Sequence, residues 1–190
     1  MGLLDAFRKD EVTGTKVLVC ALGSKFDDAR KNDEKIYKRY YPGSTSASVT
    51  TLAEVRQAIG QRYDILHLFC DLDSQGSIAD GAGVRVTGAE LLQSCVDAGV
   101  KVLWMASDNV AGAYAAGFKA KGFKLNVVLT ERRLGPYFSL FLDGLLTRMS
   151  AGESFSKSWS AVTKPEGKSV QPDIPQMISS AARGGVILRP

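Results

Sequence analysis

Two polar residues stand where buried strands of this chain would end. Asp71 follows the apolar run Asp64–Cys70, and Ser107 follows the run Val100–Ala106. In an open parallel sheet, ligands and reacting groups lie just beyond the carboxyl ends of the strands, so both residues should face one cleft. A serine at such a position becomes a nucleophile only when a general base lies beside it and a third group holds that base in place.

The base that a hydrolase would need is missing from this position. His67 is the chain's only histidine, and it lies four residues before Asp71 inside an apolar run. At roughly 3.3 Å per residue this is about 13 Å from the end of the strand. A carboxylate in its place is too weak a base for a serine hydroxyl. We therefore expect His67 to be a core residue and Ser107 not to be the nucleophile of a hydrolase.

A second chemistry fits the same residues. Asp71-Leu72-Asp73 together with Ser107 resembles the haloacid-dehalogenase-type phosphotransferases, in which the first aspartate attacks phosphorus and the second acts as acid and base beside Mg²⁺. Three departures count against it: the strand Lys16–Leu22 precedes this motif, no Gly-Thr follows the second aspartate, and no later strand ends in the acidic pair that completes the metal site. This phosphotransferase remains an alternative.

The elements that must position these residues alternate along the chain. Apolar runs of strand length alternate with helical patterns, and Thr51 and Thr87 each stand three residues before a glutamate in the manner of a capping box. This alternation predicts βαβ units, and so an α/β fold: a three-layer αβα sandwich with a mainly parallel central sheet. Strands are expected at 16–22, 47–50, 64–70, 100–106, 125–130 and 185–188, and helices at 33–41, 51–59, 87–98, 108–121, 136–149 and 153–162. A long loop, 72–86, and a polar linker with Pro165, Pro172 and Pro175 complete the chain.

Composition narrows the class of protein. The chain has 190 residues, of which 45% are apolar, and its net charge of +4 is spread along it rather than massed on one basic stretch. Nucleic acid is therefore not an expected partner. The three widely spaced cysteines, Cys20, Cys70 and Cys95, predict reduced core thiols and a cytoplasmic protein. No apolar stretch approaches the roughly 20 residues that span a bilayer, no glycine fingerprint for a dinucleotide follows the first strand, and neither a metal nor a cofactor is predicted.

A family resemblance adds to these patterns. The segment Asp64-Ile65-Leu66-His67-Leu68-Phe69-Cys70, a capped helix and then Val102–Ser107 resemble the CHAT peptidases, relatives of the caspases. Two later segments are also similar to that family: Phe138–Ser154, and the ending Pro175-Gln176-Met177 followed by Gly185–Leu188. The resemblance covers residues 15–190, which we predict to be one domain behind an amphipathic segment, 1–14.

What the resemblance implies depends on two changed residues. It implies a caspase-like fold in which Asp71 stands at the position of the catalytic histidine and Ser107 at that of the nucleophilic cysteine. A chain without this dyad is expected to be a catalytically inactive domain that binds or scaffolds a protein partner, as in bacterial immune or death-signalling complexes. A small-ligand or nucleotide sensor is the other alternative. The candidate cleft residues are Ser24, Asp71, Asp73, Ser107, Asp108, Asn109, Arg132 and Arg133.

Overall fold

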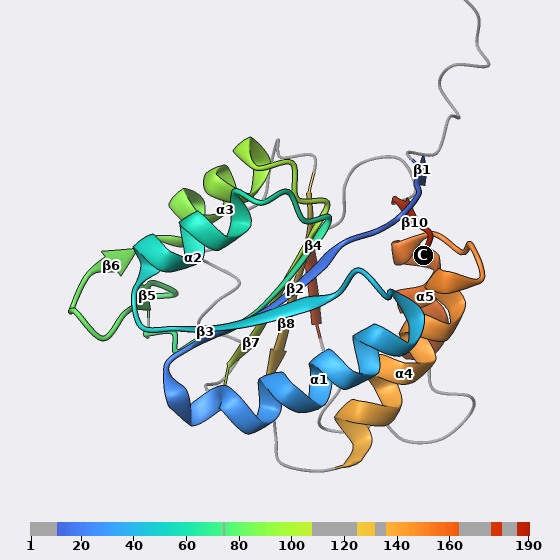
Figure 1. Cartoon of the computed structure of the whole chain (residues 1–190), viewed down its shortest axis with the longest axis horizontal. Helices are drawn as coiled ribbons and strands as arrows, with labels where there is room; N and C mark the ends of the chain where they lie inside the picture. Colours follow the sequence, from blue (N-terminus) through green and yellow to red (C-terminus); the bar gives the residue numbers. More distant parts are fainter. Residues whose placement is uncertain (1–10, 74, 108–124, 132–135, 164–175, 180–185) are drawn as a thin grey trace, which may run out of the picture.

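The computed structural model describes residues 11–73, 75–107, 125–131, 136–163, 176–179 and 186–190. At its centre lies a six-stranded sheet with the order β3-β2-β4-β7-β8-β9 (Figure 1). Five strands are parallel, and β9 runs antiparallel to β8. The strands are β2 (Val17–Leu22), β3 (Thr45–Val49), β4 (Ile65–Phe69), β7 (Val102–Ser107), β8 (Asn126–Glu131) and β9 (Gln176–Ser179).

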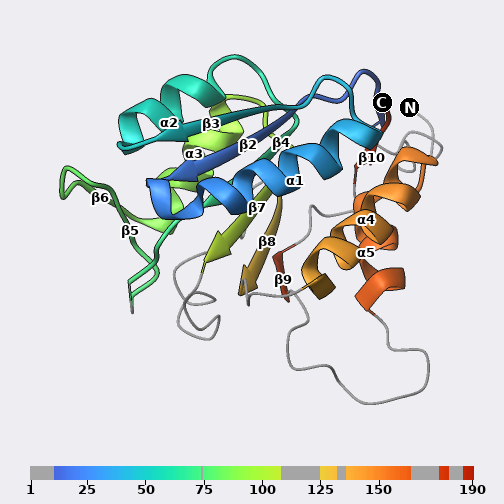
Figure 2. The same ribbon diagram turned by 60° about the horizontal axis from the view of Figure 1, so that its bottom comes forward.

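Helices cover both faces of this sheet. Side chains of α1, α4 and α5 share one buried cluster with the sheet, and those of α2 and α3 share another, an arrangement that Figures 1 and 2 show from two directions. The predicted three-layer αβα sandwich with a mainly parallel sheet is therefore confirmed. The helices are α1 (Asp27–Tyr40), α2 (Leu52–Ile59), α3 (Gly88–Asp97), α4 (Pro136–Ser150) and α5 (Phe155–Thr163).

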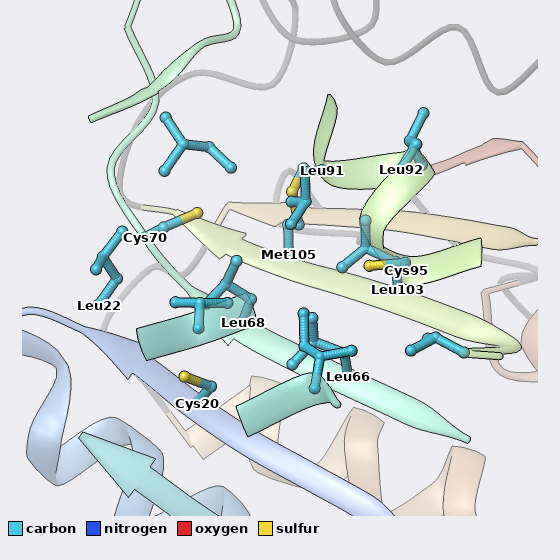
Figure 3. Packing of buried hydrophobic residues seen from close by; sticks show 14 of the residues in the cluster. Cys20, Leu22, Leu66, Leu68, Cys70, Leu91, Leu92, Cys95, Leu103 and Met105 are labelled. Atoms are coloured by element: carbon cyan, nitrogen blue, oxygen red, sulfur yellow. The ribbon is translucent and has the colours of Figure 1, made fainter. Parts of the chain in front are cut away.

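The alternation of side chains along each strand divides the core between two kinds of packing. On β4, Leu66 and Leu68 face α2 and α3, whereas Ile65 and Phe69 face α1 and α4. The α2/α3 face is aliphatic and contains all three cysteines (Figure 3). The opposite face is aromatic, with Trp104, Phe155 and Trp159 among its members.

Both predicted capping boxes are present. The Thr51 hydroxyl accepts a hydrogen bond from the Glu54 amide at 3.2 Å while the Glu54 carboxylate accepts one from the Thr51 amide at 3.0 Å. Thr87 and Glu90 make the same reciprocal pair at the start of α3. Each box satisfies two amide donors that the first helical turn leaves without a partner inside the helix.

Several boundaries differ from the prediction. Helix α1 begins at Asp27 rather than at residue 33, directly after a 3₁₀ turn, Ser24–Phe26, because its first two turns are held by charged side chains that carry no apolar periodicity. The expected loop 72–86 contains an antiparallel hairpin, β5 (Ile78–Ala79) with β6 (Arg85–Val86). Strand β9 lies where a polar linker was expected.

The final strand also has a different place. β10 (Ile187–Leu188) pairs with β1 (Glu11–Val12) in a separate two-stranded parallel sheet and does not extend the central one. The expected helix 108–121, Pro165, Pro172 and Pro175 lie outside the described residues.

Candidate functional site

The carboxyl end of the sheet, where β2, β4, β7 and β8 finish, holds both starting residues. Phe69 on β4 is in register with Ala106 on β7, and the Cys70 amide donates to the Ala106 carbonyl at 3.1 Å. Ser107 is the last residue of β7, and Asp71 lies two residues beyond the end of β4, so both stand at this end of the sheet. Ser107 is in register with Glu131 on its other side.

Asp71 forms an ion pair with a residue that the sequence analysis did not single out. Its carboxylate lies 2.6 Å from Lys25 Nζ, with both side chains about half exposed. Lys25 follows β2, the strand beside β4, and its ammonium group also lies 4.7 Å from the centre of the Phe26 ring. The order of strands, which the sequence alone does not give, makes Lys25 and Asp71 neighbours. An ion pair so open to water contributes little to stability and can exchange for a contact with a partner.

The other described candidates differ in exposure. Ser24 is exposed in the 3₁₀ turn after Gly23, which adopts a φ of 102°. Ser107 is only 1% exposed at the end of β7. Asp108, Asn109, Arg132 and Arg133 lie outside the described residues, so their place in a cleft stays a prediction.

Asp73 is engaged in building a turn. Its Oδ1 accepts hydrogen bonds from the amides of Gln75 and Ser77, both at 2.9 Å, and its Oδ2 accepts one from Arg85. The Ser77 and Gln75 amides lower the pKa of the Asp73 carboxyl. A carboxyl stabilised in its charged form is a poor proton donor, so this geometry argues against the acid–base role that the phosphotransferase alternative gives to Asp73.

The same turn recurs seven residues later. Asp80 Oδ1 accepts from the amides of Ala82 and Val84, and its Oδ2 accepts from the amide of Leu52, which fixes the hairpin to the start of α2. In both turns a glycine three residues after the aspartate has a positive φ, 75° at Gly76 and 79° at Gly83. The hairpin thus projects from the body as a braced element (Figures 1 and 2). Val84 near its tip is 52% exposed.

His67 lies in the core, as expected. Its side chain is fully buried between the rings of Phe69 and Trp104, whose centres lie 4.7 and 5.0 Å away. Its Nε2 lies 3.7 Å from Oδ2 of Asp33, a fully buried residue of α1 that the sequence analysis did not single out. Burial, together with the Asp33 charge, raises the pKa of the nearby Tyr37 hydroxyl.

The cysteines are buried free thiols, as predicted. Burial raises the pKa of Cys20 and of Cys95 to about 12, and burial followed by the charge of Asp71 raises that of Cys70. Because the thiolate is the reactive form, none of the three is suited to nucleophilic chemistry.

No helix among the described residues combines the length and apolar character that crossing a membrane requires. Within the same residues, no group of three or more His, Cys, Asp or Glu side chains is placed to hold a metal ion.

Comparisons with known proteins assign no family. No protein-family model matches the sequence, and no curated protein matches it. Among solved structures, one that resembles the chain is a response regulator protein from Burkholderia pseudomallei with a phosphorylated aspartic acid, a calcium ion and citrate. The two chains are 13% identical, and the match has a TM-score of 0.43. It covers 80% of this chain and 75% of the response regulator chain. A likeness this distant assigns neither family nor activity to the chain.

Proposed function

We propose that residues 15–190 form a catalytically inactive, caspase-like domain that binds a protein partner through the carboxyl end of its sheet. One observation carries the proposal: Asp71, at the position of the peptidase histidine in the resemblance, is paired with Lys25, while the chain's only histidine lies in the core. Asp71 is too weak a base for a serine hydroxyl, and the ammonium group of Lys25 is engaged by Asp71.

The sheet supports the resemblance in one respect. The peptidase dyad requires residues at the same end of two different strands, and Asp71 and Ser107 stand at the carboxyl ends of β4 and β7, which pair with each other. A mainly parallel sheet with helices on both faces is also what the resemblance implies. The buried reduced thiols fit the reducing cytoplasm in which bacterial immune or death-signalling complexes assemble.

The β5–β6 hairpin is the part of this region best suited to contact a protein. It follows Asp71 directly, it is braced by two aspartate turns, and Val84 presents an apolar side chain to solvent. A braced loop loses little conformational entropy on binding, so its contacts contribute more of their gross energy to affinity.

Rebuilding the dyad tests the resemblance. We expect the pKa of the thiol introduced by Ser107→Cys to be lower when Asp71→His is also present, because a neighbouring imidazole promotes the thiolate. Ultraviolet absorbance of the thiolate measures this pKa and needs no reagent to reach a buried position. The native thiols give a low background, since burial raises the pKa of all three. The same pKa with and without Asp71→His would show that the two positions do not form a dyad.

Partner binding is tested by purification from the native host. A specific partner should be retained by the wild-type chain and by Leu140→Asp, and lost with Val84→Asp. Leu140 is the matched control because it is the other large apolar side chain exposed among the described residues, and it lies on α4. A fluorophosphonate probe that labels wild-type protein but not Ser107→Ala would instead establish a hydrolase.

A further inference from the structure

Strand β3 forms one lateral edge of the central sheet and has β2 as its one neighbour among the described strands. Its sequence, Thr45-Ser46-Ala47-Ser48-Val49, contains no charged residue, no proline and no glycine, and its register with β2 runs without a bulge. Natural edge strands are commonly protected from pairing by such charges, prolines or bulges. β3 carries none of these devices within the strand.

The open hydrogen-bonding groups of β3 can be assigned. The Val49 carbonyl accepts from the Gly23 amide beside β2, so it points into the sheet. Backbone direction alternates along a strand, which turns the N–H and C=O groups of Ser46 and Ser48 toward the open side. The side chains of these two serines turn toward α1, because the Ser46 hydroxyl bonds to Arg30 and Glu34, and Ser48 bonds to Asp27.

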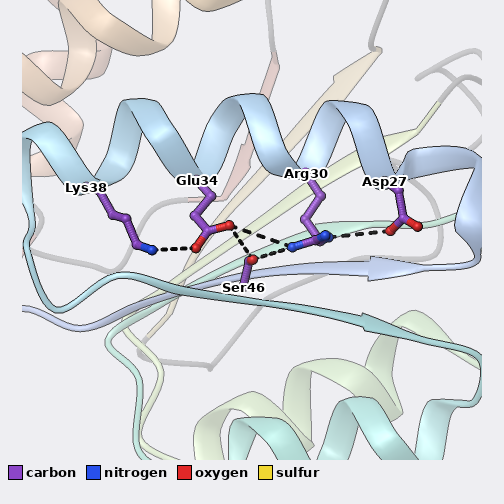
Figure 4. A network of polar contacts seen from close by, with 5 residues as sticks. All are labelled: Asp27, Arg30, Glu34, Lys38 and Ser46. Atoms are coloured by element: carbon purple, nitrogen blue, oxygen red, sulfur yellow. Dashed lines mark hydrogen bonds and ion pairs between the residues drawn. The ribbon is translucent and has the colours of Figure 1, made fainter.

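A row of alternating charges flanks this edge. Asp27, Arg30, Glu34 and Lys38 lie along one side of α1 and face Ser46 (Figure 4). Ser46 contacts both inner members, so it marks the middle of the row. The outer members are the more exposed ones: 33% of the Asp27 side chain and 53% of the Lys38 side chain reach solvent.

We propose that β3 pairs antiparallel with β3 of a second copy of this chain, about a two-fold axis beside Ser46. Ser46 would then exchange both of its backbone hydrogen bonds with Ser46 of the second copy, joining the two sheets into one. The charge order − + − + reads + − + − from the other direction. The axis therefore places Asp27 of each copy opposite Lys38 of the other, and Arg30 of each copy opposite Glu34 of the other. This self-complementarity selects a second copy over an unrelated strand.

The dimer has a consequence for the carboxyl ends of the sheets. Paired β3 strands run in opposite directions, so the two carboxyl ends point away from each other. The inference stands apart from the proposed function, because a monomer could bind the same partner through Val84.

Backbone substitution gives the first test, with the dissociation constant measured by analytical ultracentrifugation. Ser46→Pro removes the outward N–H, and Ser46→Ala is its matched control because both variants lose the same hydroxyl. We expect Ser46→Pro to raise the dissociation constant about 10- to 100-fold relative to Ser46→Ala, since two hydrogen bonds disappear across the axis. A wild-type chain that stays monomeric at its highest soluble concentration, or equal constants for the two folded variants, would overturn the proposal.

Charge reversal gives a second test that does not depend on the folding of the proline variant. Asp27→Lys and Lys38→Glu should each raise the dissociation constant about tenfold by placing like charges across the axis. Mixing the two variants should restore dimers, because each chain then supplies the charge that the other lacks. Damage confined to one chain cannot be repaired by mixing, so a mixture no tighter than its components would also overturn the proposal.

Discussion

The two ends of the central sheet use their polar residues in opposite ways. At the amino end, where the strands begin, polar contacts join segments far apart in sequence: the Tyr41 hydroxyl donates to the Leu188 carbonyl at 2.9 Å, and Arg189 pairs with Glu11. At the carboxyl end, Lys25 and Asp71 form a half-exposed pair beside a hairpin braced by its own turns. Figure 1 shows β1 and β10 on the side of the molecule away from this hairpin, and Figure 2 shows the same for β10.

This difference suggests that the amino end of the sheet stabilises the fold, whereas the carboxyl end is available for binding. The amino end ties the first described residues to the last, because the amide of Thr15 donates to Arg189 and that of Arg189 donates to Val12. At the carboxyl end, the tie between the Leu52 amide and Asp80 joins the hairpin to α2, whereas Lys25 and Asp71 lie half exposed on the surface. We therefore expect these two charged side chains to change without opening the core.

Alkaline pH should have the largest effect, because it acts on the core between the two ends. Burial raises the pKa of Cys20 and Cys95 from 9 to about 12, so each thiol binds its proton more tightly in the folded chain. Their contribution is complete below pH 9 and is lost as pH rises toward 12. Each thiol should lower the free energy of unfolding by about 1.4 kcal/mol per pH unit in that window. Urea unfolding at pH 8, 9, 10 and 11 measures the slope.

A cysteine variant checks the origin of that slope. Cys95→Ala removes one titrating thiol, so its unfolding free energy should fall less steeply above pH 9 than that of the wild-type chain, whatever its stability at pH 7. Parallel slopes would assign the alkaline loss to other groups, such as Tyr37 and Tyr41, whose pKa values burial also raises.

Gly152→Ala should damage the amino end next most. Gly152 has a φ of 92°, and a Cβ there would lie 2.8 Å from a guanidinium nitrogen of Arg189. Backbone strain and displacement of Arg189 together should cost about 1–3 kcal/mol. Gly83→Ala is the matched control in the hairpin, because Gly83 also has a positive φ but has open space around it. Thermal unfolding should rank Gly152→Ala as the less stable variant, and the reverse order would contradict the proposed tie.

Tyr41→Phe should weaken the same end by about 1–2 kcal/mol. The substitution keeps the ring in the core and removes the hydroxyl that satisfies the Leu188 carbonyl. Hydrogen exchange can localise the loss: amides of β10 should exchange faster, while those of β6 in the hairpin should not change. Equal acceleration at both places would indicate global loosening.

The sequence predicted contacts between residues close together in the chain better than contacts between residues far apart in it. Thr51 and Thr87 could be predicted as helix caps because the threonine and glutamate of a capping box lie within four residues of each other. The buried strands could be predicted because their apolar runs are continuous. Lys25 was missed because its relation to Asp71 follows from the order of strands. Asp33 was missed because a buried aspartate in a helix carries no local sign of the histidine that it faces.

The turns show a second limit. Asp73 suggested phosphoryl chemistry when read beside Asp71, and only the amides around it show that it builds a turn. The repeat of aspartate and glycine at Asp80 and Gly83 was available in the sequence and could have predicted the hairpin.

Asp71→Ala should have the smallest effect on stability and thereby gives the sharpest test of the difference between the two ends. The ion pair with Lys25 is about half exposed, so water screens it and its loss should change the free energy of unfolding by less than about 0.5 kcal/mol. If the carboxyl end binds a partner, the same variant should still lower partner retention, and Lys25→Ala should do so as well. The two measurements, urea unfolding and co-purification, separate binding from folding. A loss of stability as large as that of Tyr41→Phe would mean that the carboxyl end also holds the fold together, and unchanged retention would remove Asp71 from the binding surface.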